Sequence, residues 1–383
     1  MRRLNLMNTK VLFVVSSNFQ MMFAYFLSKY MNGEVQYLIL DSQNSEVNDI
    51  SIRAAGNNKA WLIPSLKNTV KDLVFDNKTL FKHVSDIIRK ESPTTVILFK
   101  DNDFLTCKVI ETAAQIEAKI TLVQEGVGIY RYPERNYKQW LRMKVPVILG
   151  YPWVYSFIQG MHPKVKAIAA VEPDMLPDVK TRLKEVIKIP KQAPPRHLLY
   201  EYSKILPDQT LQSLKGHHSA SLLYIGQPLS KLGILKPEEE KAFLQTLLLI
   251  TKKNHLNLLV KPHPYEDLDI YDGFKNELTL LSHSVPAEII PLFLSLTCVV
   301  TPYSSAADNM STWFHTPVLY VHDLLLKRQL IIDYELKGSF VKNHTELDDL
   351  IAKYSCQSMD SQKFYTEKES ELDYQQFVAA LLH

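Results

Sequence analysis

The chain has 383 residues, of which 46% are hydrophobic and 22% charged, and its formal net charge is +3 at pH 7. These values describe an ordinary globular protein of about two domains, and they exclude a molecule that is basic throughout. The three cysteines are widely spaced and show no zinc-binding pattern, which favours a reducing compartment.

The first apolar run of the chain, residues 11–15, is too short for the core of a signal peptide. It is also far shorter than the ~20 apolar residues of a membrane-spanning helix. We therefore interpret it as the first strand of a sheet, and we expect the protein in the cytoplasm.

The first half of the chain alternates apolar runs with longer segments of helical pattern. Strands are predicted at 11–15, 35–40, 95–99 and 120–123, and helices at 19–30, 66–90 and 106–118. Continuous apolar strands that alternate with helices are typical of a parallel sheet covered on both faces.

The segment 145–160 allows two interpretations, because it is apolar but contains Pro146 and Pro152 and has lysines and arginines on both sides. It is either a buried segment interrupted by prolines or a surface that touches a membrane or a lipid-linked acceptor.

Prolines 190, 194 and 195 then indicate a linker. The second half repeats the alternation, with strands predicted at 221–225, 256–260, 298–300 and 318–321 and helices at 237–252 and 287–296. We therefore predict an α/β protein with two domains, 1–190 and 191–383. An amphipathic helix near the C-terminus is a candidate to pack back on the first domain.

A carboxylate follows the fourth predicted strand. Glu125 precedes Gly126, and Gly128 is nearby, so that no side chain obstructs its approach to a ligand. A general base needs such access to the proton that it removes. The alternative is a carboxylate that caps the next turn.

A histidine follows the strand at 256–260, between Pro262 and Pro264 and close to Lys261. The carboxyl ends of parallel strands form the edge where ligands bind in open α/β sheets. His263 could therefore stabilise a phosphate leaving group or act as a general acid. The alternative is a histidine that bonds a backbone carbonyl.

Three further candidates lie at the same predicted edge. Ser304 and Ser305 at a helix start could bind a phosphate, or could serve as ordinary N-caps. Gly226 and Gln227 form another strand-to-loop turn, and Glu288 could hold ribose hydroxyls or only stabilise a first helical turn.

On the first domain, Ser16 and Ser17 follow the first strand and could line the cleft, where an acceptor would bind. Arg131 and Arg135 could attract a polyanionic acceptor, or could belong to a solvated face. The acid-x-acid spacing of Asp101–Asp103 is interpreted as a turn, since no donor-binding features surround it. A Walker phosphate loop, a dinucleotide fingerprint and a nucleic-acid-binding signature are absent.

Taken together, three motifs in this order resemble those of the bacterial GT-B sialyltransferases. They are Gln124-Glu125-Gly126, Lys261-Pro262-His263-Pro264 and Ser304-Ser305. The likeness is greatest to the capsular polysialyltransferases and the lipooligosaccharide sialyltransferases, and it covers about residues 120–320. Gln124 stands where those families have the first of two acids.

The resemblance implies two Rossmann-like domains with parallel sheets that face a central cleft, the first binding the acceptor and the second binding CMP-sialic acid. It implies an inverting transfer, without metal or cofactor, in the synthesis of a bacterial capsule or lipooligosaccharide, by an enzyme at the inner face of the membrane. Glu125 would be the base and His263 would contact the CMP phosphate. The nucleotide site would include Gly226, Gln227, Lys261, Pro264, Glu288, Ser304 and Ser305.

Two other functions share parts of this pattern. One is a transferase of teichoic-acid or capsule synthesis that uses CDP-glycerol or CDP-ribitol. The other is a nucleotide-binding assembly protein without catalytic activity. Release of CMP from each donor separates the two transferases, and loss of transfer in variants of Glu125 and His263 separates an enzyme from the assembly protein.

Overall fold

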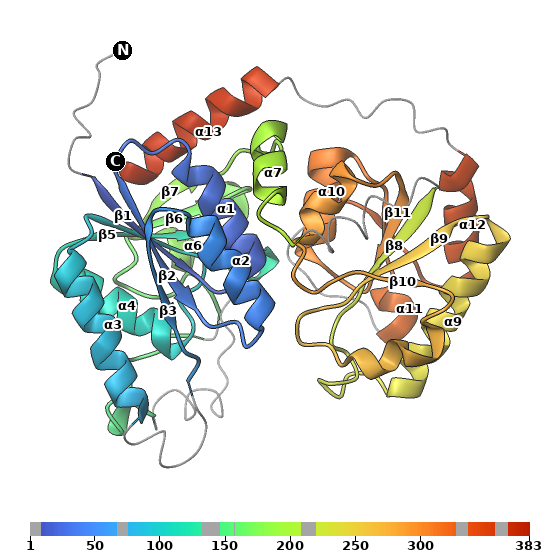
Figure 1. Ribbon diagram of the computed structural model, residues 1–383, viewed down its shortest axis with the longest axis horizontal. Coiled ribbons are helices and arrows are strands. Elements are labelled where there is room, and N and C mark those ends of the chain that lie inside the picture. The colour runs from blue at the N-terminus through green and yellow to red at the C-terminus, as the bar shows by residue number, and fades with distance from the viewer. Residues whose placement is uncertain are drawn as a thin grey trace. The chain divides into compact units, whose positions relative to one another are not determined.

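The computed structural model describes residues 9–66, 76–131, 146–156, 158–207, 220–326, 336–356 and 367–383. The chain forms two compact units (Figure 1), the first of residues 1–190 with 368–383 and the second of residues 191–367. Each unit contains a parallel sheet against which helices pack, so the predicted α/β class is confirmed.

The sheet of the first unit has the strand order β3-β2-β1-β4-β5-β6-β7, and every pair of neighbours is parallel. Residues 11–15 are buried almost completely, as expected for a strand with both faces covered. The strands are β1 (Lys10–Val15), β2 (Glu34–Leu40), β3 (Lys59–Ile63), β4 (Thr95–Leu98), β5 (Lys119–Val123), β6 (Ala167–Ala170) and β7 (Glu185–Lys188).

The helices of the first unit include one from the far end of the chain. Tyr374 of the last helix is fully buried, and its ring centroid lies 6.3 Å from that of Phe23 (Figure 1, α13 and α1). The α-helices are α1 (Asn18–Ser28), α2 (Ser45–Ala55), α3 (Asn77–Glu91), α4 (Phe104–Gln115), α6 (Asp178–Thr181) and α13 (Glu367–Leu382), and the 3-10 helices are η2 (Val127–Tyr130) and η3 (Pro173–Met175).

The sheet of the second unit has the order β10-β9-β8-β11-β12-β13, again with parallel neighbours only. Its strands are β8 (Ser221–Ile225), β9 (Asn257–Lys261), β10 (Thr279–Leu280), β11 (Leu296–Thr301), β12 (Val318–Tyr320) and β13 (Ser339–Phe340). Its helices are α7 (Arg196–Ser203), α9 (Pro237–Lys253), η4 (Leu268–Phe274), η5 (Ala287–Leu292), α10 (Ser305–Phe314), α11 (His322–Leu326) and α12 (His344–Cys356).

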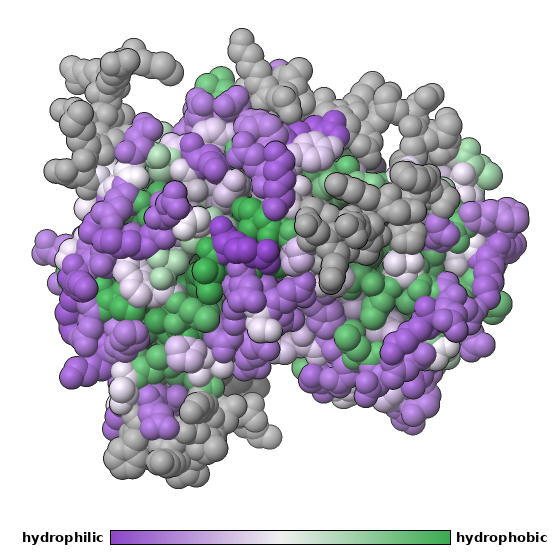
Figure 2. All heavy atoms as spheres, in the orientation of Figure 1, coloured by the Kyte–Doolittle hydropathy of each residue, from purple (hydrophilic) through white to green (hydrophobic). Residues whose placement is uncertain are grey.

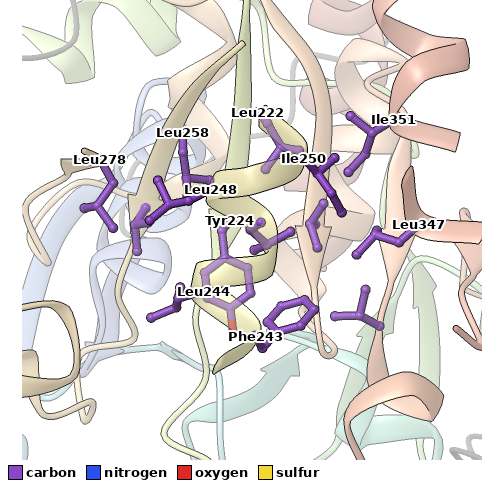
Figure 3. Packing of buried hydrophobic residues seen from close by; sticks show 14 of the residues in the cluster. Leu222, Tyr224, Phe243, Leu244, Leu248, Ile250, Leu258, Leu278, Leu347 and Ile351 are labelled. Carbon is purple, nitrogen blue, oxygen red and sulfur yellow. The ribbon is translucent and has the colours of Figure 1, made fainter. Parts of the chain in front are cut away.

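The core of the second unit joins one face of this sheet to two helices (Figure 3). Tyr224 of β8 packs against Phe243 of α9 with ring centroids 5.8 Å apart, and Leu347 of α12 belongs to the same buried cluster. Helix α9 begins with Pro237 and has three glutamates in its first turn, a sequence suited to the positive end of a helix.

Both sheets have a point where the order of strands reverses, between β1 and β4 in the first and between β8 and β11 in the second. Ligands of open α/β sheets bind at the carboxyl ends of the strands beside such a point. No helix in the described part of the chain has the length and apolar character needed to cross a bilayer. Among the residues coloured in Figure 2, hydrophilic ones predominate on the face drawn, with hydrophobic areas between them.

Candidate active site

In the first unit, the carboxylate of Glu125 at the end of β5 is held by the beginning of α1. The Ser17 hydroxyl donates to Glu125 Oε1 over 2.8 Å, and Gln20 Nε2 donates to Glu125 Oε2 over 2.6 Å. Ser17 is also the N-cap of α1, because its Oγ accepts the Gln20 N–H. Each carboxylate oxygen thus has one fixed donor and keeps a further lone pair for a ligand hydroxyl.

Gln20, which is 2% exposed, connects this carboxylate to the end of β1. Its Oε1 accepts the backbone N–H of Ser16 over 2.7 Å and also faces the Ser16 hydroxyl at 3.2 Å. Ser16, Ser17 and Glu125, three predicted site residues, therefore lie together at the reversal point of the sheet. Sequence reasoning missed Gln20, although Ser17-x-x-Gln20 is the spacing of a capping box.

The neighbouring Gln124 points away from Glu125, as successive side chains of a strand do. Its Oε1 accepts from the Tyr130 hydroxyl at 2.7 Å and from the Val171 N–H at 2.8 Å. The Tyr130 hydroxyl in turn accepts the N–H of Glu172. Gln124 therefore joins the ends of β5 and β6, and the residue that differs from the family pattern is used here to support the turn beside Glu125.

A buried lysine supports the same turn. Lys180 is 1% exposed, and its ammonium donates to the carbonyl of Ile129 in η2 over 2.5 Å. Burial lowers the pKa of this ammonium to about 8. The sequence gives no sign of this role, because Lys180 lies 51 positions from its partner.

The acid-x-acid sequence Asp101–Asp103 is a structural turn. The buried Asp101 carboxylate accepts the N–H groups of Gly160 and His162, while Asp103 caps α4 through the Thr106 N–H. Burial raises the pKa of Asp101. The described residues contain no group of three or more histidines, cysteines and carboxylates placed to hold a metal ion.

The structure describes only one of the two arginines that were predicted to bind the acceptor. Arg131 is exposed just after η2. Arg135 lies outside the described residues.

In the second unit, one hydrogen bond fixes the backbone of His263 and another fixes its ring, both within the same loop. The His263 N–H donates to Glu266 Oε2 over 2.7 Å, and the ring Nδ1 accepts the Tyr265 N–H over 3.1 Å. Burial, with a smaller effect of Lys261 and His283, lowers the pKa of His263 to about 4. The ring is therefore neutral at pH 7, and its one proton is on Nε2, because Nδ1 accepts a hydrogen bond.

Gly226 at the end of β8 lies directly against the carboxylate that anchors this loop. A Cβ at position 226 would lie 2.4 Å from Glu266 Oε2 and 2.9 Å from the Tyr271 hydroxyl. That hydroxyl donates to Glu266 Oε1 over 2.7 Å. The second unit thus brings Gly226 and His263 together through Glu266, which sequence reasoning missed because no recognised motif contains it.

Glu266 is 5% exposed and is an unusual carboxyl group. Burial, reinforced by the neighbouring Glu240, raises its pKa to about 8, although hydrogen bonds from Tyr271 and the His263 N–H act in the opposite direction. The group therefore keeps its proton to a higher pH than an ordinary glutamate does.

Lys261 supports the loops at this edge. Its ammonium is buried and donates to the carbonyls of Pro262 at 3.1 Å and His283 at 3.3 Å, which ties the end of β9 to the segment after β10. Pro264 is exposed and Gln227 half-buried, both next to residues of the same edge. Lys261 therefore acts there as a fixed charge below the surface.

Ser304 and Ser305 lie where β11 passes into α10. Ser304 occupies the N-cap position with an extended backbone, but its side chain makes no capping hydrogen bond. Both serines are half-buried, so hydroxyl and N–H groups stand together at the positive end of a ten-residue helix. Such an arrangement suits a phosphate. Glu288 is 4% exposed in η5 and accepts from Asn309 of α10 over 3.4 Å, so it lies next to this helix.

A family model for alpha-2,8-polysialyltransferase (POLYST) matches residues 11–322, from the first strand to the start of α11. The chain belongs to the alpha-2,8-polysialyltransferase family. The resemblance inferred from three short motifs is thereby confirmed, and the protein is a glycosyltransferase of the sialyltransferase kind, which uses CMP-sialic acid and a glycan acceptor. No curated protein sequence matches it.

Solved structures show that this polysialyltransferase family member has the GT-B fold. UDP-GlcNAc 2-epimerase from Methanocaldococcus jannaschii, in complex with UDP-GlcNAc and UDP, is similar with a TM-score of 0.61 and 11% identity over 97% of this chain and 99% of that one. UDP-GlcNAc 2-epimerase from Neisseria meningitidis, bound to UDP-GlcNAc, has a TM-score of 0.56 and 12% identity over 98% of this chain and 100% of that one. The UDP-N-acetylglucosamine 2-epimerase from Rickettsia bellii has a TM-score of 0.57 and 14% identity over 98% of this chain and 97% of that one. These identities bear on the fold alone.

Proposed function

We propose that this polysialyltransferase transfers sialic acid from CMP-sialic acid to a hydroxyl of a sialylated surface glycan, with inversion and without a metal ion. The observation that carries the proposal is the carboxylate of Glu125, which Ser17 and Gln20 hold in one orientation at the reversal point of the first sheet. An oriented carboxylate with open lone pairs is what a general base requires.

In the proposed step, Glu125 removes the proton from the acceptor hydroxyl. The acceptor oxygen forms a bond to the anomeric carbon while the bond from that carbon to the CMP phosphate oxygen breaks. CMP leaves with the electron pair of the broken bond. A single displacement of this kind inverts the anomeric configuration, and it needs no covalent intermediate on the protein.

The departing CMP phosphate gains negative charge. We assign the stabilisation of this charge to hydrogen-bond donors of the second unit. The neutral His263 ring offers its Nε2–H, and Ser304 and Ser305 offer hydroxyls at the N-terminus of α10. Lys261 adds a fixed positive charge beneath the loop. Preorganised donors of this kind stabilise a developing oxyanion, so the proposed step needs no metal ion.

The remaining predicted nucleotide residues, Gly226, Gln227, Pro264 and Glu288, are assigned to the same donor site. On the acceptor side we assign Ser16 with Arg131 and Arg135, whose charges would attract a polyanionic glycan. The proposed setting is capsule or lipooligosaccharide synthesis, with the enzyme peripheral at the inner face of the membrane.

A donor comparison tests this function. The protein is incubated with a short labelled sialoside primer and, in separate reactions, with CMP-sialic acid and CDP-glycerol, and the release of CMP and the growth of the primer are followed. We expect CMP release and primer extension with CMP-sialic acid only, and both should persist in excess EDTA. Extension from CDP-glycerol alone would replace the proposal with a teichoic-acid type of transferase.

A further inference from the structure

A basic groove lies on the first unit, between α3 and α4. Its cavity has a volume of about 260 Å³. The residues that line it are Lys78, Phe81, Lys82, Ser85, Arg89, Lys108 and Gly150. Four of these seven carry a positive charge and none carries a negative one, so an anion is the ligand that its charge favours.

The groove follows from the sequence of α3, where Lys78, Lys82 and Arg89 recur at helical spacing and so share one face. Among the residues that the structure describes, these three form no ion pair with a carboxylate. Arg89 donates instead to the neutral amide of Gln115 over 3.0 Å. Within the described ranges, Lys108 is the one cation of the groove that lies within ion-pair distance of a carboxylate, Glu111 at 4.0 Å. Three of the four cations of the groove therefore stand outside any ion pair among the described residues.

An exposed apolar segment borders the groove. Gly150 belongs to the groove lining, and a Cβ there would lie 3.4 Å from Lys78 Cε. The two residues before it are exposed, Ile148 by 84% and Leu149 by 38%. The ring centroids of the exposed Trp153 and Tyr155 lie 5.9 Å apart. The backbone N–H of Trp153 donates to the carboxylate of Glu111 in α4.

The same segment is firmly attached to the unit. Tyr151 is buried, and its ring packs edge-on against those of Phe81 in α3 and Phe104 in α4, each at 5.1 Å. Its hydroxyl accepts from Asn77 over 2.7 Å. The segment is therefore buried only in part: Tyr151 is a buried anchor, and Ile148, Leu149, Trp153 and Tyr155 are exposed.

We infer that this combination, called here the α3–α4 surface and made of the basic groove with Ile148, Leu149, Trp153 and Tyr155, binds an anionic phospholipid bilayer. Cations attract anionic headgroups, aromatic rings lie at headgroup level, and aliphatic side chains enter the acyl boundary. A soluble glycan or a free phosphate would use the cations but would leave Ile148 and Leu149 in water. The inference names the partner behind the proposed membrane location and does not depend on the chemistry of transfer.

Vesicle co-sedimentation of the full chain tests the α3–α4 surface. Vesicles of phosphatidylglycerol mixed with phosphatidylcholine are compared with phosphatidylcholine alone, at two salt concentrations. We expect binding to the anionic vesicles, weakened by salt. Lys82→Glu should weaken it about 25-fold, since each unit of charge near such a surface is worth about fivefold and the substitution changes the charge by two units. Ile148→Ser should weaken it about fivefold at either salt concentration.

Matched controls separate this surface from general effects. Lys90→Glu changes the charge of α3 by the same amount at an exposed position that does not line the groove, and Leu183→Ser removes a side chain that is 90% exposed elsewhere in the unit. Both controls should bind vesicles like the wild type. All four variants should extend a soluble primer at the wild-type rate. Primer extension therefore tests the proposed transfer reaction, and vesicle binding tests the α3–α4 surface, so that failure of one is distinguished from failure of the other.

Two results would overturn the inference. One is equal vesicle binding by Ile148→Ser and the wild type, or by Lys82→Glu and Lys90→Glu. The other is a loss in Lys82→Glu of binding to a soluble sialic acid oligomer with vesicle binding unchanged, which would make the groove a glycan site.

Discussion

At the residue scale, Gly226 at the edge of the second sheet leaves no room for a side chain beside Glu266. A Cβ at this position would meet the Glu266 carboxylate at 2.4 Å, and that carboxylate anchors the His263 loop. We expect Gly226→Ala to displace the loop, to lower the unfolding free energy by about 1–3 kcal/mol and to weaken CMP binding.

Gly273→Ala is the matched control for this change, because a Cβ there meets nothing within 4 Å and the backbone is not left-handed. It should leave CMP affinity unchanged and the protein as stable as before or slightly more stable. Calorimetric titration of CMP and thermal unfolding of both variants give the comparison. Equal effects of the two alanines would show that the contact with Glu266 is unimportant.

Glu266 makes the stability of the second unit depend on pH. Its pKa is about 8 in the folded protein against an ordinary value of 4.5, so the folded state holds the extra proton between these values. Stability from this group is complete below pH 4.5 and is lost as the pH rises toward and through 8. Glu266→Gln removes the titration, so its unfolding temperature should fall less between pH 5 and pH 8 than that of the wild type. Parallel curves for the two proteins would contradict this assignment.

The catalytic candidates could be predicted from the sequence, whereas most of their partners could not. Glu125 and His263 stand out because each follows an apolar strand and is flanked by glycine or proline. Gln20 and Glu266 carry no such mark. Gln20 reaches Glu125 across 105 positions of the chain, and only the fold brings the two together.

At the scale of elements, the first turn of α1 has two functions that mutagenesis can separate. Ser17 caps the helix and also donates to Glu125, whereas Asn44 caps α2 through the Val47 N–H and contacts no site residue. Ser17→Ala and Asn44→Ala should each cost about 1 kcal/mol of stability. Only Ser17→Ala should lower kcat, because only this cap orients the carboxylate. Denaturant unfolding and steady-state kinetics measure the two effects, and an equal fall of kcat in both variants would refute the second function of Ser17.

Most elements that the sequence did not reveal have weak patterns for physical reasons. Strands β3 and β7 are the edges of the first sheet and expose most of their residues. Strand β7 has only two apolar residues in a row, whereas β3 has an apolar run of four residues, 60–63, which the sequence interpretation overlooked. Strand β6 is four residues long and mostly alanine, which has little preference for strands. The helix predicted at 287–296 is the short 3-10 helix η5, and Pro291 inside it cannot donate the hydrogen bond of a longer α-helix.

At the scale of the whole molecule, the chain leaves the first unit after residue 190 and returns to it with α13. Tyr374 of α13 is fully buried against Phe23 and should contribute strongly to the stability of the first unit. Tyr374→Ala should cost about 3–5 kcal/mol, whereas Leu372→Ala, which removes a half-exposed side chain of the same helix, should cost little. Hydrogen exchange should locate the loss of protection in the first unit. Loss confined to residues 191–367 would contradict this role of α13.

The fold of the whole chain was predictable because parallel strands and helices alternate through both halves, and the family model confirms the sialyltransferase resemblance. The central claim about its chemistry concerns one carboxylate. The most direct test is the turnover of Glu125→Gln with CMP-sialic acid and a sialoside primer, measured together with donor affinity and beside Glu172→Gln, the carboxylate after the next strand. Our account predicts that Glu125→Gln lowers kcat by about 10²–10⁴-fold and leaves the donor Kd unchanged. Wild-type turnover in Glu125→Gln, or a comparable loss found only in Glu172→Gln, would contradict it.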